Sequence, residues 1–107
     1  MLCSAQISNT TIAIVATDAP LTKTQCHRLA VTAHDGMARA IIPSHTPLDG
    51  DLVFGVSTTK GEVDHAVFRD IGASAAVCLS RAIARGVYEA TTDEDDILPT
   101  YKKTNCI

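Results

Sequence analysis

Two short β-branched segments constrain the fold of this chain more than any other feature. Residues 11–17, "TIAIVAT", and residues 51–58, "DLVFGVST", are nearly continuous in apolar character. Such runs are typical of strands covered on both faces, as in parallel sheets. Two strands are too few for a stable independent sheet. We therefore expect an α/β chain that completes a larger sheet, either by oligomerising or with a second chain.

A helix is predicted after the first strand, which we expect to end at Asp18-Ala19-Pro20. Thr22 followed three residues later by Gln25 is a capping-box pattern. The helix is expected to continue to about Ala38. Its apolar stripe is formed by Leu29, Ala33 and Met37.

Residues 40–50 contain two prolines and an Asp-Gly pair, which predicts a loop. Gly55, inside the second strand, predicts close approach of another backbone. A long helix is expected over residues 66–89, with a wide face of small residues that indicates close helix packing. Its expected stripe is Ile71, Ala75, Cys78 and Ala82, with Leu79, Ile83 and Val87 beside it.

Composition narrows the functional classes. The chain has 107 residues, room for one small domain, and a net charge of −3. Because no basic block is longer than Lys102-Lys103, nucleic-acid binding is not expected. No apolar run approaches the roughly 20 residues that span a bilayer. The first eight residues lack the basic and apolar regions of a secretory signal, so we expect a cytoplasmic protein.

The cysteines and histidines indicate neither a metal site nor a cofactor. The cysteines are Cys3, Cys26, Cys78 and Cys106, and the histidines are His27, His34, His45 and His65. Their spacing matches neither a zinc site nor a disulfide framework. We expect Cys26 and Cys78 to be buried in helices, and His27 and His34 to lie on a helix surface.

The triplet Asn9-Thr10-Thr11, just before the first strand, has three interpretations. It can be a plain polar start of a strand. It also satisfies the N-glycosylation pattern, which without an export signal we take as a chance match. Thirdly, Thr10 can be a latent N-terminal nucleophile. If the bond between Asn9 and Thr10 is cut, the α-amine of Thr10 can take the proton of its own hydroxyl.

A family resemblance favours the third interpretation. The segment "NTTIAIVATDAPLTKTQCHRLA" and the later "DGDLVFGVST" resemble the small-subunit region of the nylon-oligomer hydrolase and D-aminopeptidase (DmpA-type) superfamily. The resemblance covers residues 9–58 and extends loosely into the following helix. It implies a four-layer α/β/β/α sandwich, to which this chain contributes two strands and two helices. It also implies a precursor that cuts itself before a Thr or Ser.

The resemblance assigns roles to four residues. Thr10 matches the nucleophile, Asn9 the residue before the cut, and Asp49 and Asp51 a pair of acids that hold and tune Thr10. The chain would divide into residues 1–9 before the cut, 10–90 in the sandwich and a polar tail at 91–107. A larger subunit, from the same precursor or a separate chain, would supply a lysine and an asparagine, and the pairs would oligomerise.

The implied activity is hydrolysis of linear amides such as 6-aminohexanoate oligomers, with Asn before Thr and "DGD" favouring the nylon-oligomer branch. Two alternatives stay open. One is an aminopeptidase or N-acyl transferase with the same fold. The other is a non-catalytic structural or truncated subunit.

Overall fold

A computed structural model describes residues 9–105, which form two strands and three helices. In chain order they are β1 (Ile12–Leu21), α1 (Lys23–Ala40), β2 (Leu52–Lys60), α2 (His65–Glu89) and α3 (Tyr101–Thr104). The predicted α/β class and its two strands and two long helices are confirmed. The four-layer sandwich stays a prediction, because the described residues form one two-stranded sheet with its helices. Residues 1–8 of the predicted leading segment, with Cys3 and Cys106, lie outside the described residues.

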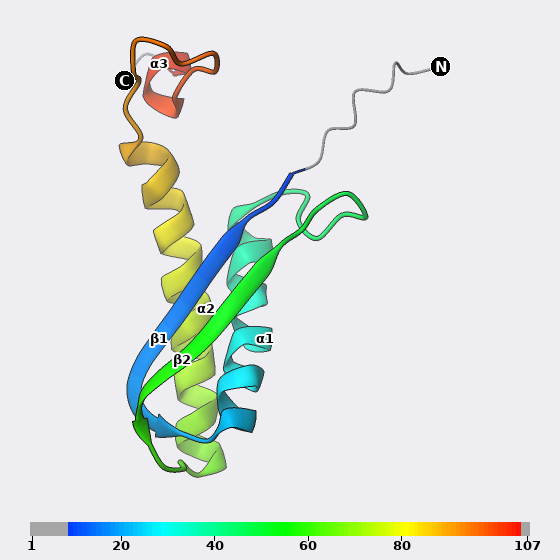
Figure 1. Ribbon diagram of the computed structural model, residues 1–107, viewed down its shortest axis with the longest axis vertical. Helices are drawn as coiled ribbons and strands as arrows, with labels where there is room; N and C mark the ends of the chain where they lie inside the picture. The colour runs from blue at the N-terminus through cyan, green and yellow to red at the C-terminus, as the bar shows by residue number, and fades with distance from the viewer. Residues whose placement is uncertain (1–8, 106–107) are drawn as a thin grey trace.

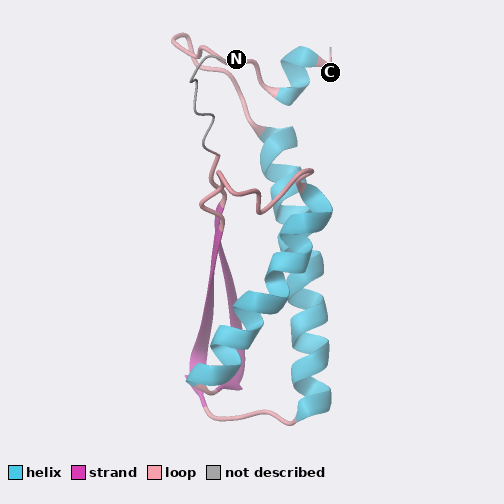
Figure 2. Cartoon of the chain, turned by 90° about the vertical axis from the view of Figure 1, so that its right-hand side faces the viewer, coloured by secondary structure: helices cyan, strands magenta, loops and turns pink. Residues whose placement is uncertain are grey.

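The strands β1 and β2 pair in parallel, with Ile12 opposite Leu52 and Ser57 opposite Thr17. Both long helices lie behind this ribbon in Figure 1. Turned by 90°, the molecule shows the strands on one side and α1 and α2 on the other, as two layers (Figure 2). Within residues 9–105, no helix combines the length and the apolar character needed to cross a membrane.

The first strand is longer than predicted. It continues through Asp18-Ala19-Pro20 to Leu21, with a shift of register between Thr17 and Pro20. Two residues of β1, Asp18 and Ala19, there face one of β2, Thr58, which is a bulge. A bulge accommodates a proline that cannot donate to the ladder. The Ser57 hydroxyl donates to the Ala19 carbonyl at 2.6 Å and secures the bulge. The expectation that Asp18-Ala19-Pro20 ends the strand was therefore wrong.

The first helix begins as predicted. The Thr22 hydroxyl accepts the Gln25 N–H at 3.1 Å, and the Gln25 side chain accepts the Thr22 N–H at 3.1 Å. This capping box satisfies donors that would otherwise be unpaired at the helix start. The predicted stripe of Leu29, Ala33 and Met37 is buried and forms the centre of the core.

Two glycines let backbones approach closely. A Cβ at Gly55 of β2 would overlap the Cys26 carbonyl of α1, so the predicted close approach at Gly55 is confirmed. A Cβ at Gly36 of α1 would overlap the Ala76 carbonyl of α2. Glycine at these positions therefore sets the spacing of α1 against both the sheet and α2.

The long helix α2 packs closely on α1, as expected, but through a neighbouring face. Its buried residues are Gly72, Ala76 and Leu79, whereas Cys78 is exposed and borders a groove between α2 and β1. The prediction that Cys78 is buried was therefore wrong, because α2 packs on α1 and touches the sheet only lightly. Cys26 is half-buried.

The face of the sheet opposite the helices is apolar and exposed. Its exposed large side chains are Ile12, Ile14, Leu52, Phe54 and Val56. Ile12 is 69% exposed and Phe54 is 53% exposed. Large exposed apolar surfaces are uncommon on monomeric proteins and are typical of interaction surfaces. The sequence predicted a sheet covered on both faces, and within residues 9–105 only one of the two faces is covered.

Candidate functional site

The segment before β1 and the segment before β2 meet at one end of the sheet. Because the strands are parallel, their starts lie side by side. Asn9 forms a bridge with Asp49, the Gly50 N–H donates to the Asn9 carbonyl at 3.0 Å, and the Leu52 N–H donates to the Thr11 carbonyl at 3.0 Å. This pairing brings the predicted site residues Asn9, Thr10, Asp49 and Asp51 together, although nothing in the geometry alone tests their catalytic role.

Thr10 is exposed, and its hydroxyl lies against the backbone of Gly50. A Cβ at Gly50 would lie 2.9 Å from Thr10 Oγ1, which is too close for a real contact. Glycine between Asp49 and Asp51 therefore leaves the space that the Thr10 hydroxyl occupies.

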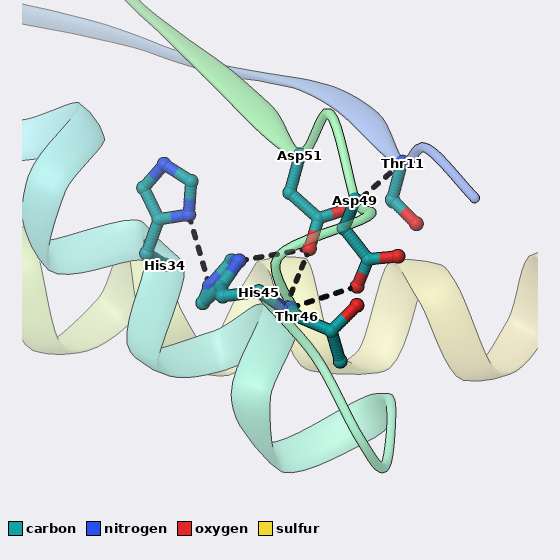
Figure 3. Close-up of polar contacts among 6 residues, drawn as sticks. All are labelled: Thr11, His34, His45, Thr46, Asp49 and Asp51. Carbon is teal, nitrogen blue, oxygen red and sulfur yellow. Dashed lines mark hydrogen bonds and ion pairs between the residues drawn. The ribbon is translucent and has the colours of Figure 1, made fainter. Parts of the chain in front are cut away.

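The Asp51 carboxylate is held by three donors. Its Oδ1 accepts the Thr11 N–H at 3.0 Å, and its Oδ2 accepts the backbone N–H of His45 at 2.9 Å and ring Nδ1 of His45 at 2.8 Å (Figure 3). The side chain is only 7% exposed. The His45 backbone N–H, followed by the Thr11 N–H and the His45 ring, lowers the pKa of Asp51 against the opposing effect of burial. The carboxylate is therefore ionised and fixed in direction.

Asp49 has a different environment from Asp51. Its Oδ2 accepts the Thr46 N–H at 3.0 Å, and its own N–H donates to the Thr46 carbonyl at 2.9 Å. These bonds close the turn that precedes β2, within the loop that the Asp-Gly pair predicted. Asp49 thus shapes the loop beside Asn9, whereas Asp51 reaches across to the segment that contains the candidate nucleophile.

Two histidines that the sequence did not assign to the site are linked to Asp51, His45 directly and His34 through His45. Ring Nε2 of His45 faces Nδ1 of His34 at 3.2 Å, and the rings meet edge to face with centroids 4.7 Å apart. His34 is half-buried on α1, so its predicted place on the helix surface is only partly correct. The available signal was His45, a polar residue between Pro43 and Pro47 and just before the two acids.

Within the described part of the chain, no three His, Cys, Asp or Glu side chains are grouped so that they could hold a metal ion. The His34, His45 and Asp51 side chains form a line of hydrogen bonds and do not converge on one point (Figure 3). The arrangement is suited to orienting polar groups and holding protons.

Residues 3–96 match Peptidase family S58. An uncharacterised aminopeptidase of Mycobacterium tuberculosis is 42% identical over an alignment of 106 residues. The alignment covers 88% of this chain and 30% of that protein. An uncharacterised aminopeptidase of Mycobacterium leprae is 40% identical over an alignment of 105 residues. That alignment covers 87% of this chain and 28% of that protein.

A 6-aminohexanoate-oligomer endohydrolase of Kocuria sp. is 38% identical over 55 residues, which cover 51% of this chain and 16% of that protein. This chain therefore spans less than a third of the length of each of these relatives.

Proposed function

Since this chain belongs to Peptidase family S58, we propose that it carries the nucleophile of a hydrolase. The nucleophile is Thr10, which becomes N-terminal when the Asn9–Thr10 peptide bond is cut. A threonine hydroxyl is a weak nucleophile unless a base takes its proton. A free α-amine, with an ordinary pKa of about 7.7–8.0, can do so near neutral pH. Cutting creates that amine on the residue that bears the hydroxyl.

The observation that carries this proposal is the way the Asn9–Thr10 peptide is held. The Asn9 carbonyl accepts the Gly50 N–H, and the Thr11 N–H is held by Asp51. In the cutting step, Thr10 Oγ attacks the Asn9 carbonyl carbon and loses its proton, while the peptide nitrogen gains one and leaves as the amine. The Gly50 N–H would stabilise the negative charge that develops on the Asn9 oxygen.

The ester formed between Asn9 and Thr10 Oγ is then hydrolysed by water. The products are an Asn9 carboxylate and a Thr10 with free hydroxyl and amine. Turnover repeats this chemistry on a substrate amide: Thr10 Oγ is acylated as the amine leaves, and water releases the acid. Asp51 acts as a fixed anion beside this site, and Asp49 shapes the loop that supports it.

For the substrate we propose linear amides, with 6-aminohexanoate oligomers as one class and peptides with a free amino terminus as the other. The relatives named aminopeptidase match 87–88% of this chain, whereas the endohydrolase of Kocuria sp. matches 51%. The broader match favours the aminopeptidase alternative over the oligomer hydrolase. An N-acyl transferase would differ in passing the acyl group to an amine instead of water.

We further propose that a larger subunit completes the enzyme. The exposed apolar face of the sheet, represented by Ile14 and Phe54, gives it a surface to cover. By the family resemblance this subunit brings a lysine and an asparagine to the site. If no such subunit exists, the remaining alternative applies, in which the chain is a non-catalytic structural or truncated subunit.

The test is mass spectrometry of the purified full-length protein that contains this chain. A fragment that begins at position 10 is expected in the wild type and in Thr10→Ser, and none in Thr10→Ala. Thr24→Ala, which removes an exposed hydroxyl from α1, is the matched control and should be cut normally. Activity on amino-acid amides and on 6-aminohexanoate oligomers then separates the substrate classes. An intact wild-type chain that hydrolyses either substrate would refute Thr10 as an N-terminal nucleophile.

A further inference from the structure

The hydrogen-bonded line from His34 through His45 to Asp51 ends on the Thr11 N–H, one residue from Thr10. We infer that His45, held by His34, is a positioning residue that aims the Asp51 carboxylate at the Thr10–Thr11 segment. This inference rests on the proposed function of Thr10. It gives a role to two side chains that neither the sequence motif nor the family match assigns.

The first argument is the number of bonds that His45 makes to one oxygen. Both its backbone N–H and its ring Nδ1 bond Asp51 Oδ2, so a single residue supplies two of the three donors on the carboxylate. The third donor is the Thr11 N–H itself. Among these contacts, the His45 ring is the one side-chain donor that sets the direction of the carboxylate. Removing the ring leaves the Asp51 side chain with only backbone donors.

The second argument is the backbone of His45, which has a φ of 56°. Left-handed φ values are uncommon for residues other than glycine, although asparagine, aspartate and histidine tolerate them better than most. This conformation accompanies the double contact of the His45 N–H and ring with one carboxylate oxygen. An unfavourable backbone state retained beside a candidate site is an indication of a functional constraint.

The third argument is the proton arrangement. Because Nδ1 of His45 donates to a carboxylate, Nε2 is the atom that faces His34. One proton between Nε2 of His45 and Nδ1 of His34 makes the bond, whichever ring carries it. The hydrogen bond between the two rings therefore forms when both rings are neutral and when one of them is protonated. If both rings were protonated, the N–H at Nε2 of His45 would face the N–H at Nδ1 of His34, and the bond would be lost. His34, on the firmly packed α1, thus fixes the rotation of the His45 ring.

The consequence is a carboxylate whose direction is set before the reaction. A displacement of about 1 Å in a supporting group can cost about 100-fold in rate. We therefore expect His45 to affect the rates of cutting and of turnover, and not the affinity for substrate, since its ring contacts Asp51 and lies on the side away from Thr11 (Figure 3).

The experiment compares two replacements in the full-length protein. His45→Gly removes the ring but accepts the left-handed backbone, and His45→Asn accepts that backbone and keeps an N–H donor close to the position of Nδ1. His45→Gly should slow cutting and lower kcat by about 10- to 100-fold with little change in KM, and His45→Asn should recover most of the loss. His34→Leu should give a smaller loss, and His27→Leu, on the exposed side of α1, none.

Exchange of the Thr11 amide hydrogen, followed by NMR, gives a readout that does not need activity. It should accelerate in His45→Gly and return towards the wild-type rate in His45→Asn. If the protein is not cut and Thr10→Ala does not change its activity, the proposed function fails. The exchange rate of the Thr11 amide hydrogen still decides whether His45 positions Asp51. Unchanged exchange in His45→Gly, or equal rate losses in both variants that follow their thermal stability, would overturn the inference.

Discussion

The backbone N–H of Thr11 donates to Oδ1 of Asp51 at 3.0 Å, across 40 positions of sequence. This bond joins the residue after the candidate nucleophile to the residue before β2. It extends the parallel pairing of the strands with a side-chain acceptor that carries a negative charge. The same carboxylate continues to His45, so the strand starts and the loop after α1 form one connected unit.

Replacing Asp51 by Asn should disconnect this unit. An amide NH₂ group cannot accept, so it would face either the Thr11 N–H or the two His45 donors without a bond. We expect Asp51→Asn to slow cutting at Asn9–Thr10 by about tenfold or more, as followed by mass spectrometry over time. Asp70→Asn, which removes an exposed carboxylate on α2, is the control. Normal cutting in Asp51→Asn would contradict the role of the carboxylate.

The contribution of Asp51 to stability should depend on pH in one direction. Because its pKa is lowered in the folded chain, the stabilisation is fully present above the ordinary value of 3.8. It is lost as the pH falls through the lower folded value. The difference in free energy of unfolding between wild type and Asp51→Asn should therefore be constant around neutral pH and shrink as the pH falls below 3.8. A difference that grows on acidification would contradict the lowered pKa; urea unfolding at several pH values measures it.

Two helical glycines should respond to alanine in opposite ways. A Cβ at Gly36 meets the Ala76 backbone, whereas a Cβ at Gly86 of α2 meets nothing within 4 Å. Gly36→Ala should lower the free energy of unfolding by about 1–3 kcal/mol or more by forcing α1 and α2 apart. Gly86→Ala should raise it by about 0.5–1 kcal/mol through helix propensity. Chemical denaturation measures both, and equal effects would mean that the α1–α2 spacing is not tight.

The exposed apolar face of the sheet should tolerate charge poorly in the full-length protein. Phe54→Lys places an ammonium group at the centre of that face, and burying it against a partner layer is costly. We expect insoluble or uncut protein. Val31→Lys introduces the same charge at an exposed valine of α1 and should behave as wild type. Soluble, normally cut Phe54→Lys protein would show that nothing covers this face.

Several features followed from local patterns alone. The capping box at Thr22, the apolar stripe through Leu29 and the close approach at Gly55 each depend on neighbouring residues or on a single missing side chain. The bulge at Pro20 was missed, because a proline ordinarily ends a strand and only the pairing with β2 reveals the extra residue.

The site shows the same division. Asn9, Thr10, Asp49 and Asp51 were proposed from the family resemblance, and their closeness follows from the parallel pairing of the two strands that they precede. His34 was not identified, because its partner His45 is 11 residues away and no periodic pattern links a helix to a following loop. Nor did the sequence distinguish Asp49, which bonds its own turn, from Asp51, which bonds the opposite segment.

The sequence by itself determined the α/β class and the helix start at Thr22, because these depend on short-range patterns of polarity and backbone preference. The choice of Thr10 as candidate nucleophile rests on the family resemblance. Only the tertiary structure decided which face of α2 meets α1, which face of the sheet is left exposed and which donors hold Asp51. Those features depend on contacts between segments far apart in the chain, where close packing and hydrogen-bond direction select one arrangement among several that the pattern allows.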